Sequence, residues 1–228
     1  MTRRILFVLT SHDDLGGVRK TGFYVPEAAH PFHVFKQHGY QIDFVSPKGG
    51  KPPFDGLKLD DPQQKSFLEH SEVAGKLENT LTTDQVQPGI YDAIFYVGGH
   101  GTMWDFADNA ALARIAAEIY EKGGVVSAVC HGPAGLVNIR LSNGEFLVKG
   151  KNVAAFTNQE EAAVNLTNVV PFLLESKLVE RGAKHIPAAN FQSNVQVSER
   201  LVTGQNPASS AGVAEAVVKL LQAQPVGA

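Results

Sequence analysis

The stretch GGVVSAVCHGP, residues 123–133, decides how this chain folds. An apolar run of strand length ends at Cys130, and a turn punctuated by glycine and proline follows it. This order is typical of a nucleophile elbow, in which a sharp turn from a strand into a helix holds a reactive side chain at the carboxyl edge of a sheet. A continuous apolar strand that leads directly into a helix predicts a parallel sheet covered on both faces.

Apolar segments of strand length alternate with helical patterns along the rest of the chain. We therefore predict one α/β domain over residues 1–228, a doubly wound, mostly parallel sheet sandwiched by helices, of the flavodoxin-like type. The segment 48–90 is rich in proline and glycine and then charged, which predicts a small inserted cap segment; the alternative is an ordinary connecting helix with a long loop. Expected strands are 5–10, 41–46, 91–97, 125–129 and 153–156, expected hairpins turn at 142–144 and 199–200, and expected helices begin near Glu27 and cover 112–119, 171–181 and 208–221.

The bulk composition excludes several classes of function. The net charge of −3 comes with no basic block, so the electrostatic footprint of a nucleic-acid-binding protein is missing. No run approaches the roughly 18 apolar residues of a membrane span, and the short apolar stretch 5–9 after two arginines is read as a first strand rather than a signal peptide. A single cysteine fits a reducing compartment, so we expect a cytoplasmic protein.

Cys130 is the main candidate for a reactive group. Its thiolate would be favoured by the N-terminus of the following helix, which predicts a pKa well below the ordinary cysteine value. Backbone N–H groups at such a turn can stabilise an oxyanion. The alternative is that a lone cysteine is simply a small buried hydrophobic residue, but the adjacent His131, which can accept the thiol proton, and the Gly-Pro that follows favour the nucleophile.

Three further groups can complete a catalytic site at the same sheet edge. A histidine base needs a carboxylate to fix its tautomer, and Glu160 and Glu161 follow the expected strand 153–156. Either glutamate can equally be a solvated residue in the first turn of a helix. The loop 98–102 can present a backbone N–H as an oxyanion donor. Glu27, at the start of a helix, would have a raised pKa if its carboxyl approached Cys130.

Several motifs in order resemble the ThiJ/PfpI superfamily, whose members share the class I glutamine amidotransferase-like fold. More narrowly, they are similar to its glyoxalase III and heat-shock chaperone branch. The motifs run from the first strand to the last helix, and they are CHGP at 130–133, KTG at 20–22 with EA at 27–28 and HPF at 30–32, DFVSP at 43–47, GHGT at 99–102, FTNQEE at 156–161 and LVTGQNPAS at 201–209.

The resemblance assigns roles to individual residues. It implies that Cys130 is the nucleophile and His131 its base, and that Glu161, counted from Phe156-Thr157, is the third member, with Glu160 as the alternative one residue away. The further positions that it implies are Glu27 as a buried carboxyl beside the thiol and the backbone N–H groups of Gly99 and His131 as oxyanion donors. His100 and Trp104, in and beside the loop 98–102, are candidate substrate contacts. Trp104 and Phe106 can line the pocket or belong to the core.

The resemblance further implies an enzyme that converts methylglyoxal and related 2-oxoaldehydes to 2-hydroxy acids without glutathione, metal or organic cofactor, in a homodimer. A thiol, a base and oxyanion donors suit that reaction. The alternatives are a stress-related holdase chaperone, a protein deglycase, a cysteine amidase or peptidase, and a redox sensor, whereas a glutaminase would need a synthetase partner. Zinc binding by His30, His33 or Glu27 has weak support, since a third ligand is poorly defined.

Overall fold

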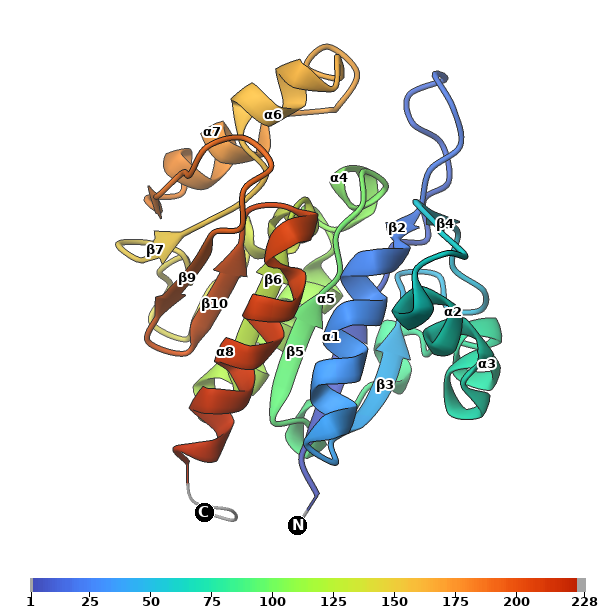
Figure 1. The fold of residues 1–228 in the computed structure, drawn as a ribbon. Coiled ribbons are helices and arrows are strands. Elements are labelled where there is room, and N and C mark those ends of the chain that lie inside the picture. The colour runs from blue at the N-terminus through green and yellow to red at the C-terminus, as the bar shows by residue number, and fades with distance from the viewer. Residues whose placement is uncertain (1, 225–228) are drawn as a thin grey trace.

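A six-stranded sheet forms the centre of the molecule. The computed structural model describes residues 2–224, and its strands lie in the order β3-β1-β5-β6-β10-β9 (Figure 1). Neighbours from β3 to β10 run parallel, and β9 pairs antiparallel with β10 through the turn at Glu199-Arg200. The strands are β1 (Arg4–Val8), β3 (Gln41–Val45), β5 (Ala93–Tyr96), β6 (Val125–Val129), β9 (Val195–Ser198) and β10 (Leu201–Gly204).

Helices cover both faces of this sheet. The helices α1 (Val25–Gln37) and α8 (Ser210–Gln222) lie side by side on one face, and α5 (Ala110–Glu121) covers the other (Figure 1). Along β1, Leu6 and Val8 join the core on the α5 side, while Ile5 and Phe7 join the core on the α1 and α8 side. Successive strand residues point to opposite faces, so an unbroken apolar strand fills both cores. The predicted doubly wound fold is confirmed.

Shorter elements connect these layers. The two-residue strands β2 and β4 pair with each other, as do β7 and β8. The elements are β2 (Phe23–Tyr24), β4 (Phe54–Asp55), α2 (Pro62–Glu69), α3 (Ser71–Glu78), η1 (Thr83–Gln85), η2 (Pro88–Ile90), α4 (Thr102–Asp105), η3 (Gly132–Leu136), β7 (Asn152–Val153), α6 (Asn158–Ala163), α7 (Leu174–Glu180), β8 (Lys184–His185) and η4 (Pro207–Ser209).

Two sequence expectations differ from the structure. The expected strand 153–156 is limited to β7, because Ala154 N–H donates to the Thr203 side chain (2.9 Å) and Phe156 N–H to the Cys130 carbonyl (3.0 Å). The expected hairpin around 142–144 is reduced to a single bridge between Arg140 and Phe146.

The segment 48–90 packs beside the sheet. Its helix α2 contacts α1, α3 contacts β3, and β4 pairs with β2. A role as a cap over the pocket remains a prediction. Across residues 2–224, no helix combines the length and apolar character needed to cross a membrane.

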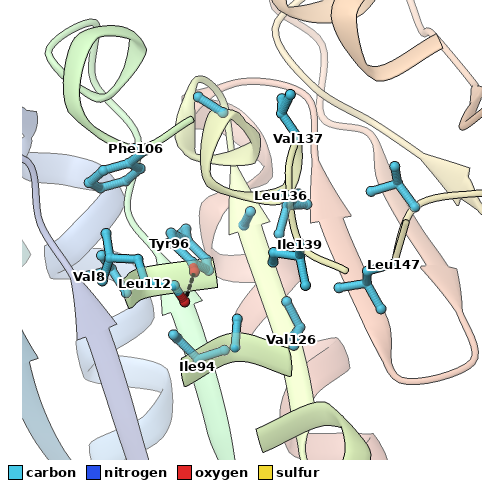
Figure 2. Close-up of a cluster of buried hydrophobic side chains, with 14 of the residues drawn as sticks. Val8, Ile94, Tyr96, Phe106, Leu112, Val126, Leu136, Val137, Ile139 and Leu147 are labelled. Carbon is cyan, nitrogen blue, oxygen red and sulfur yellow. Dashed lines mark hydrogen bonds between the residues drawn. The ribbon is translucent and has the colours of Figure 1, made fainter. Parts of the chain in front are cut away.

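The core on the α5 side supports the turn that follows Cys130. Tyr96 is fully buried there, its hydroxyl donates to the Leu112 carbonyl (3.1 Å), and Phe106 packs edge-on against its ring (Figure 2). A Cβ atom on Gly132 would lie 2.3 Å from the Tyr96 carbonyl oxygen, and one on Gly135 would lie 2.5 Å from the Tyr96 ring. Glycine at both positions therefore lets the turn sit directly on the strand beneath it. Phe106 is a core residue.

Candidate active site

Cys130 occupies a strained turn at the carboxyl end of β6. Its φ angle is +59°, a left-handed conformation that costs a residue with a side chain roughly 1–2 kcal/mol. Two backbone hydrogen bonds hold it there, from Cys130 N–H to the Gly204 carbonyl (2.9 Å) and from Phe156 N–H to the Cys130 carbonyl (3.0 Å). The side chain is thus fixed between the end of β10 and the segment that leads to α6, as a nucleophile elbow requires.

His131 and Glu161 form a hydrogen-bonded series with the thiol. His131 is fully buried, and its Nδ1 lies 3.4 Å from Cys130 Sγ. Its Nε2 lies 2.7 Å from Glu161 Oε2, and His100 Nε2 lies 2.8 Å from Glu161 Oε1. Although burial raises the pKa of Glu161, the hydrogen bonds from both imidazoles outweigh it and lower the pKa to about 2. An ionised carboxylate can only accept hydrogen bonds, so both Nε2 atoms carry a proton.

The imidazole of His131 is neutral at physiological pH. Burial and the neighbouring His100 ring, whose centroid lies 4.0 Å away, lower the pKa of His131 to about 4, against the opposing effect of Glu161. With the proton on Nε2, the unprotonated Nδ1 faces the sulfur. The arrangement therefore allows His131 to accept the thiol proton when the sulfur attacks an electrophile.

The carboxyl group of Glu27 is buried against the elbow. Glu27 lies in the first turn of α1 with no exposed surface, and a Cβ on Gly98 would lie 2.1 Å from its Oε2 and 3.0 Å from the Cys130 Cβ. Within residues 2–224, neither carboxyl oxygen has a standard hydrogen-bond partner. Burial raises the pKa of Glu27 to about 8, despite the opposing effects of the thiol and the Gly98 N–H. The group therefore holds its proton at neutral pH and can donate it.

The pKa of Cys130 is shifted in the direction opposite to the one expected from sequence. Burial raises it well above the ordinary cysteine value, and the charge of Glu27 adds to the increase, while the His131 backbone N–H acts in the opposite sense. The turn after Cys130 is the short 3-10 helix η3 rather than a regular α-helix, so the expected dipole is weak. In the resting state the group is a thiol beside a neutral base.

The loop after β5 approaches the elbow closely. Gly99 has a φ angle of +109°, and a Cβ there would lie 2.3 Å from the Gly22 carbonyl oxygen. The Thr102 hydroxyl, 2.9 Å from both the Gly99 and His131 carbonyl oxygens, ties the loop to the turn. Only glycine fits the position of Gly99. Oxyanion donation by the backbone N–H groups of Gly99 and His131 remains a prediction.

Other residues singled out in the sequence lie in different surroundings. Trp104 is half-buried and stacks on His12, with centroids 5.0 Å apart, and its contact with substrate remains a prediction. His30 pairs with Asp61 (2.9 Å), and His33 Nε2 lies 2.9 Å from the Gln63 carbonyl oxygen. These two histidines therefore have partners of their own, apart from Glu27.

A metal ion could reach one cluster in the described part of the chain. Ligand atoms of His100, His131 and Glu161 lie within 4.8 Å of one another. The same Nε2 atoms already donate to Glu161, so binding an ion would require those hydrogen bonds to break. The sequence does not predict the contact between His100 and Glu161, and the one signal that it offers is a histidine between two glycines after a strand.

The fold and this site place the chain in the class of doubly wound α/β proteins that carry a cysteine at a nucleophile elbow. The chain belongs to the DJ-1/PfpI family, whose model matches residues 18–220. It is 36% identical to glyoxalase 3 of Candida albicans, over 94% of this chain and 97% of that protein. It is 34% identical to the glutathione-independent glyoxalase HSP31 of Saccharomyces cerevisiae, over 91% and 93% of the two chains.

Solved structures agree with this assignment. The crystal structure of glyoxalase III from Candida albicans superposes with a TM-score of 0.89 at 34% identity, covering 96% of this chain and 97% of that one. The rapid encystment protein of 24 kDa from Francisella tularensis superposes with a TM-score of 0.92 at 39% identity, covering 96% and 99%.

Proposed function

We propose that this protein is a glutathione-independent glyoxalase that converts methylglyoxal and related 2-oxoaldehydes to 2-hydroxy acids. The observation that carries the proposal is the placement of a neutral imidazole and a protonated carboxyl around one buried thiol. The reaction needs a nucleophile, a proton acceptor and a proton donor that act at two adjacent carbons of the substrate. The thiol, the imidazole and the carboxyl group supply these functions in that order. Relatives at 34–36% identity that carry the glyoxalase name support the same activity.

The first step is addition of the thiol to the aldehyde. Cys130 Sγ forms a bond to C1 of the substrate, and its proton passes to His131 Nδ1, 3.4 Å away. The electron pair of the C1 carbonyl moves to its oxygen, which the backbone N–H groups of Gly99 and His131 stabilise. Glu27 then donates its proton to that oxygen, leaving a hemithioacetal and a carboxylate.

The second step moves a hydrogen between the two adjacent carbons. The Glu27 carboxylate removes the proton from C1, and the electron pair forms a double bond to C2. The His131 imidazolium returns its proton to the C2 carbonyl oxygen, which gives an enediol and a neutral imidazole. Glu27 donates its proton to C2 and accepts the proton from the oxygen on C1, which gives a thioester of the 2-hydroxy acid and restores the protonated carboxyl. C1 is oxidised and C2 is reduced by the same electron pair, so the step needs no external oxidant or reductant.

The third step hydrolyses the thioester. His131 takes a proton from water, which attacks C1, and the sulfur leaves and recovers its proton. The hydrogen bond to Glu161 stabilises the imidazolium that forms in this step and in the first. Methylglyoxal and one water thus give lactate and one proton, and the enzyme returns to its starting state.

The test is turnover by the purified protein in buffer free of glutathione. Proton NMR should show loss of methylglyoxal matched by an equal amount of lactate, and added glutathione should leave the rate unchanged. Loss of methylglyoxal without lactate, as in simple modification of the protein, would reject the proposal.

The protein is further proposed to act as a homodimer in the cytoplasm. The single cysteine has no disulfide partner within the chain, which suits a reducing compartment. Light scattering during size-exclusion chromatography should give twice the monomer mass of 24.5 kDa. A monomer mass would reject the dimer and leave the chemistry above untouched.

A further inference from the structure

An aromatic series leads from the buried imidazole to the surface. The ring centroids of His131 and Phe156 lie 4.3 Å apart, and those of Phe156 and Phe191 lie 6.3 Å apart. Phe156 is 5% exposed, whereas Phe191 is 47% exposed. Phe191 therefore lies at the exposed end of an aromatic series that begins at His131, the residue after Cys130.

The backbone of Phe191 adopts a conformation that bulky residues rarely take. Its φ angle is +61°, and a non-glycine residue in the left-handed region is an outlier when its side chain is large. Phe191 lies in the segment 186–194, which joins β8 to β9 without helix or strand. Strain of this kind persists only where surrounding contacts impose it, and it gathers at functional sites.

Glu160 is the residue that imposes the conformation. Its carboxylate is fully buried; Oε1 accepts from Phe191 N–H (2.7 Å) and from Asn206 Nδ2 (2.9 Å), and Oε2 accepts from Thr157 N–H (2.9 Å). Asn206 Nδ2 also donates to the Gln192 carbonyl (2.8 Å). The neighbouring glutamates thus have different partners, since Glu161 holds the imidazole and Glu160 holds the segment that carries Phe191.

We propose that Phe191 determines which 2-oxoaldehydes the site accepts, by packing against the substituent on C2, and that Glu160 is its positioning residue. The inference rests on the proposed glyoxalase function. A phenylalanine ring at the exposed end of this aromatic series favours apolar and aromatic substituents, because aromatic pairs gain energy beyond simple burial. The substrate class is therefore 2-oxoaldehydes with such a group, in addition to methylglyoxal.

The test compares kcat/KM for phenylglyoxal and for methylglyoxal. Phe191→Ala should lower the ratio of the two roughly 2- to 10-fold, the range expected for loss of one aromatic pair. Phe191→Gly should lower it equally while relieving the backbone strain, which separates the effect from a loss of folding. Ile90→Ala removes a similarly exposed side chain (43%) from η2. Because η2 precedes β5, it lies near the amino-terminal end of that strand, away from Cys130 at the carboxyl end of β6, and the variant should leave the ratio unchanged. An unchanged or increased ratio in both Phe191 variants would overturn the proposal.

Glu160→Gln tests the positioning role. It should raise KM for phenylglyoxal by a larger factor than it lowers kcat for the same substrate. A uniform loss of active protein would lower kcat alone, and that result would remove the positioning role of Glu160. If this variant does not fold, the Phe191 variants still decide the main proposal.

A second readout does not depend on turnover. Cys130 is the only cysteine, so its alkylation by iodoacetamide and by N-benzyl iodoacetamide can be followed by mass spectrometry. Phe191→Ala should lower the ratio of the benzyl to the small-reagent rate roughly 2- to 10-fold. An equal ratio of alkylation rates in wild type and variant would overturn the proposed contact between Phe191 and the substituent. Absence of lactate formation together with an altered ratio would reject only the glyoxalase function.

Discussion

Glu27→Gln should change how the stability of the protein depends on pH. The wild-type carboxyl is fully buried, and burial raises its pKa from 4.5 to about 8. The folded state therefore binds a proton that the unfolded state releases between these two values. The contribution of Glu27 to stability is fully present below pH 4.5, falls as pH rises, and is lost above about pH 8. Glutamine keeps the shape of the side chain but does not titrate.

The size of the effect follows from the shift. A shift of about 3.5 units at 1.36 kcal/mol per unit corresponds to roughly 5 kcal/mol across the window. Cys130 does not add to the slope there, because its raised pKa keeps it a neutral thiol. The free energy of unfolding of Glu27→Gln should therefore rise relative to that of wild type by roughly 1 kcal/mol per pH unit between pH 5 and 8.

Urea denaturation of both proteins at half-unit steps of pH measures this difference. The matched control is Glu215→Gln, which alters an exposed carboxyl on α8 and should give a difference that is flat with pH. A flat difference for Glu27→Gln as well would refute the protonated carboxyl, and with it the proton donor of the mechanism.

Two further predictions concern the thiol and its base. The rate of alkylation of Cys130 should still be rising at pH 9, because burial and Glu27 raise the thiol pKa. Glu27→Gln should move the midpoint of the rate-against-pH curve to lower pH, and a wild-type midpoint below pH 7 would contradict the neutral thiol. His131→Ala and Glu161→Gln should each lower kcat at least 100-fold, in the range of general acid–base catalysis. The double variant should have a kcat little lower than that of either single variant. Additive losses of lactate-forming activity would show that the two residues act separately.

The sequence predicts the fold well because the decisive strands are buried on both faces. Strand β6 is apolar apart from one serine and is buried throughout. A strand of this kind must be covered on both faces, which predicts a parallel sheet between two layers of helices. The expected strand 153–156 does not extend beyond Val153, because the backbone N–H groups of Ala154 and Phe156 donate to the Thr203 side chain and the Cys130 carbonyl instead of to a strand ladder. These hydrogen-bond acceptors lie far from residues 153–156 in the sequence, so local strand propensity cannot predict them.

The site is predictable in its residue types and less so in its geometry. The choice between Glu160 and Glu161 depends on where α6 begins, and Thr157 caps it with Glu160 as the reciprocal partner. The spacing Thr-x-x-Glu is the signature of such a capping box, so the sequence held a signal that assigns Glu160 to the cap. The direction of the Cys130 pKa could not be read in this way, because it depends on burial and on Glu27, 103 positions earlier in the chain.

The most direct test of the cysteine mechanism is lactate formation from methylglyoxal, without glutathione, by wild type and by Cys130→Ala. The substitution removes the only atom that can form the covalent adduct and leaves the buried His131–Glu161 pair in place. Covalent catalysis by the thiol predicts matched loss of methylglyoxal and gain of lactate in wild type. The folded variant should form lactate at less than about one hundredth of the wild-type rate. Retention of a substantial fraction of the wild-type rate by folded Cys130→Ala would contradict covalent catalysis by the thiol.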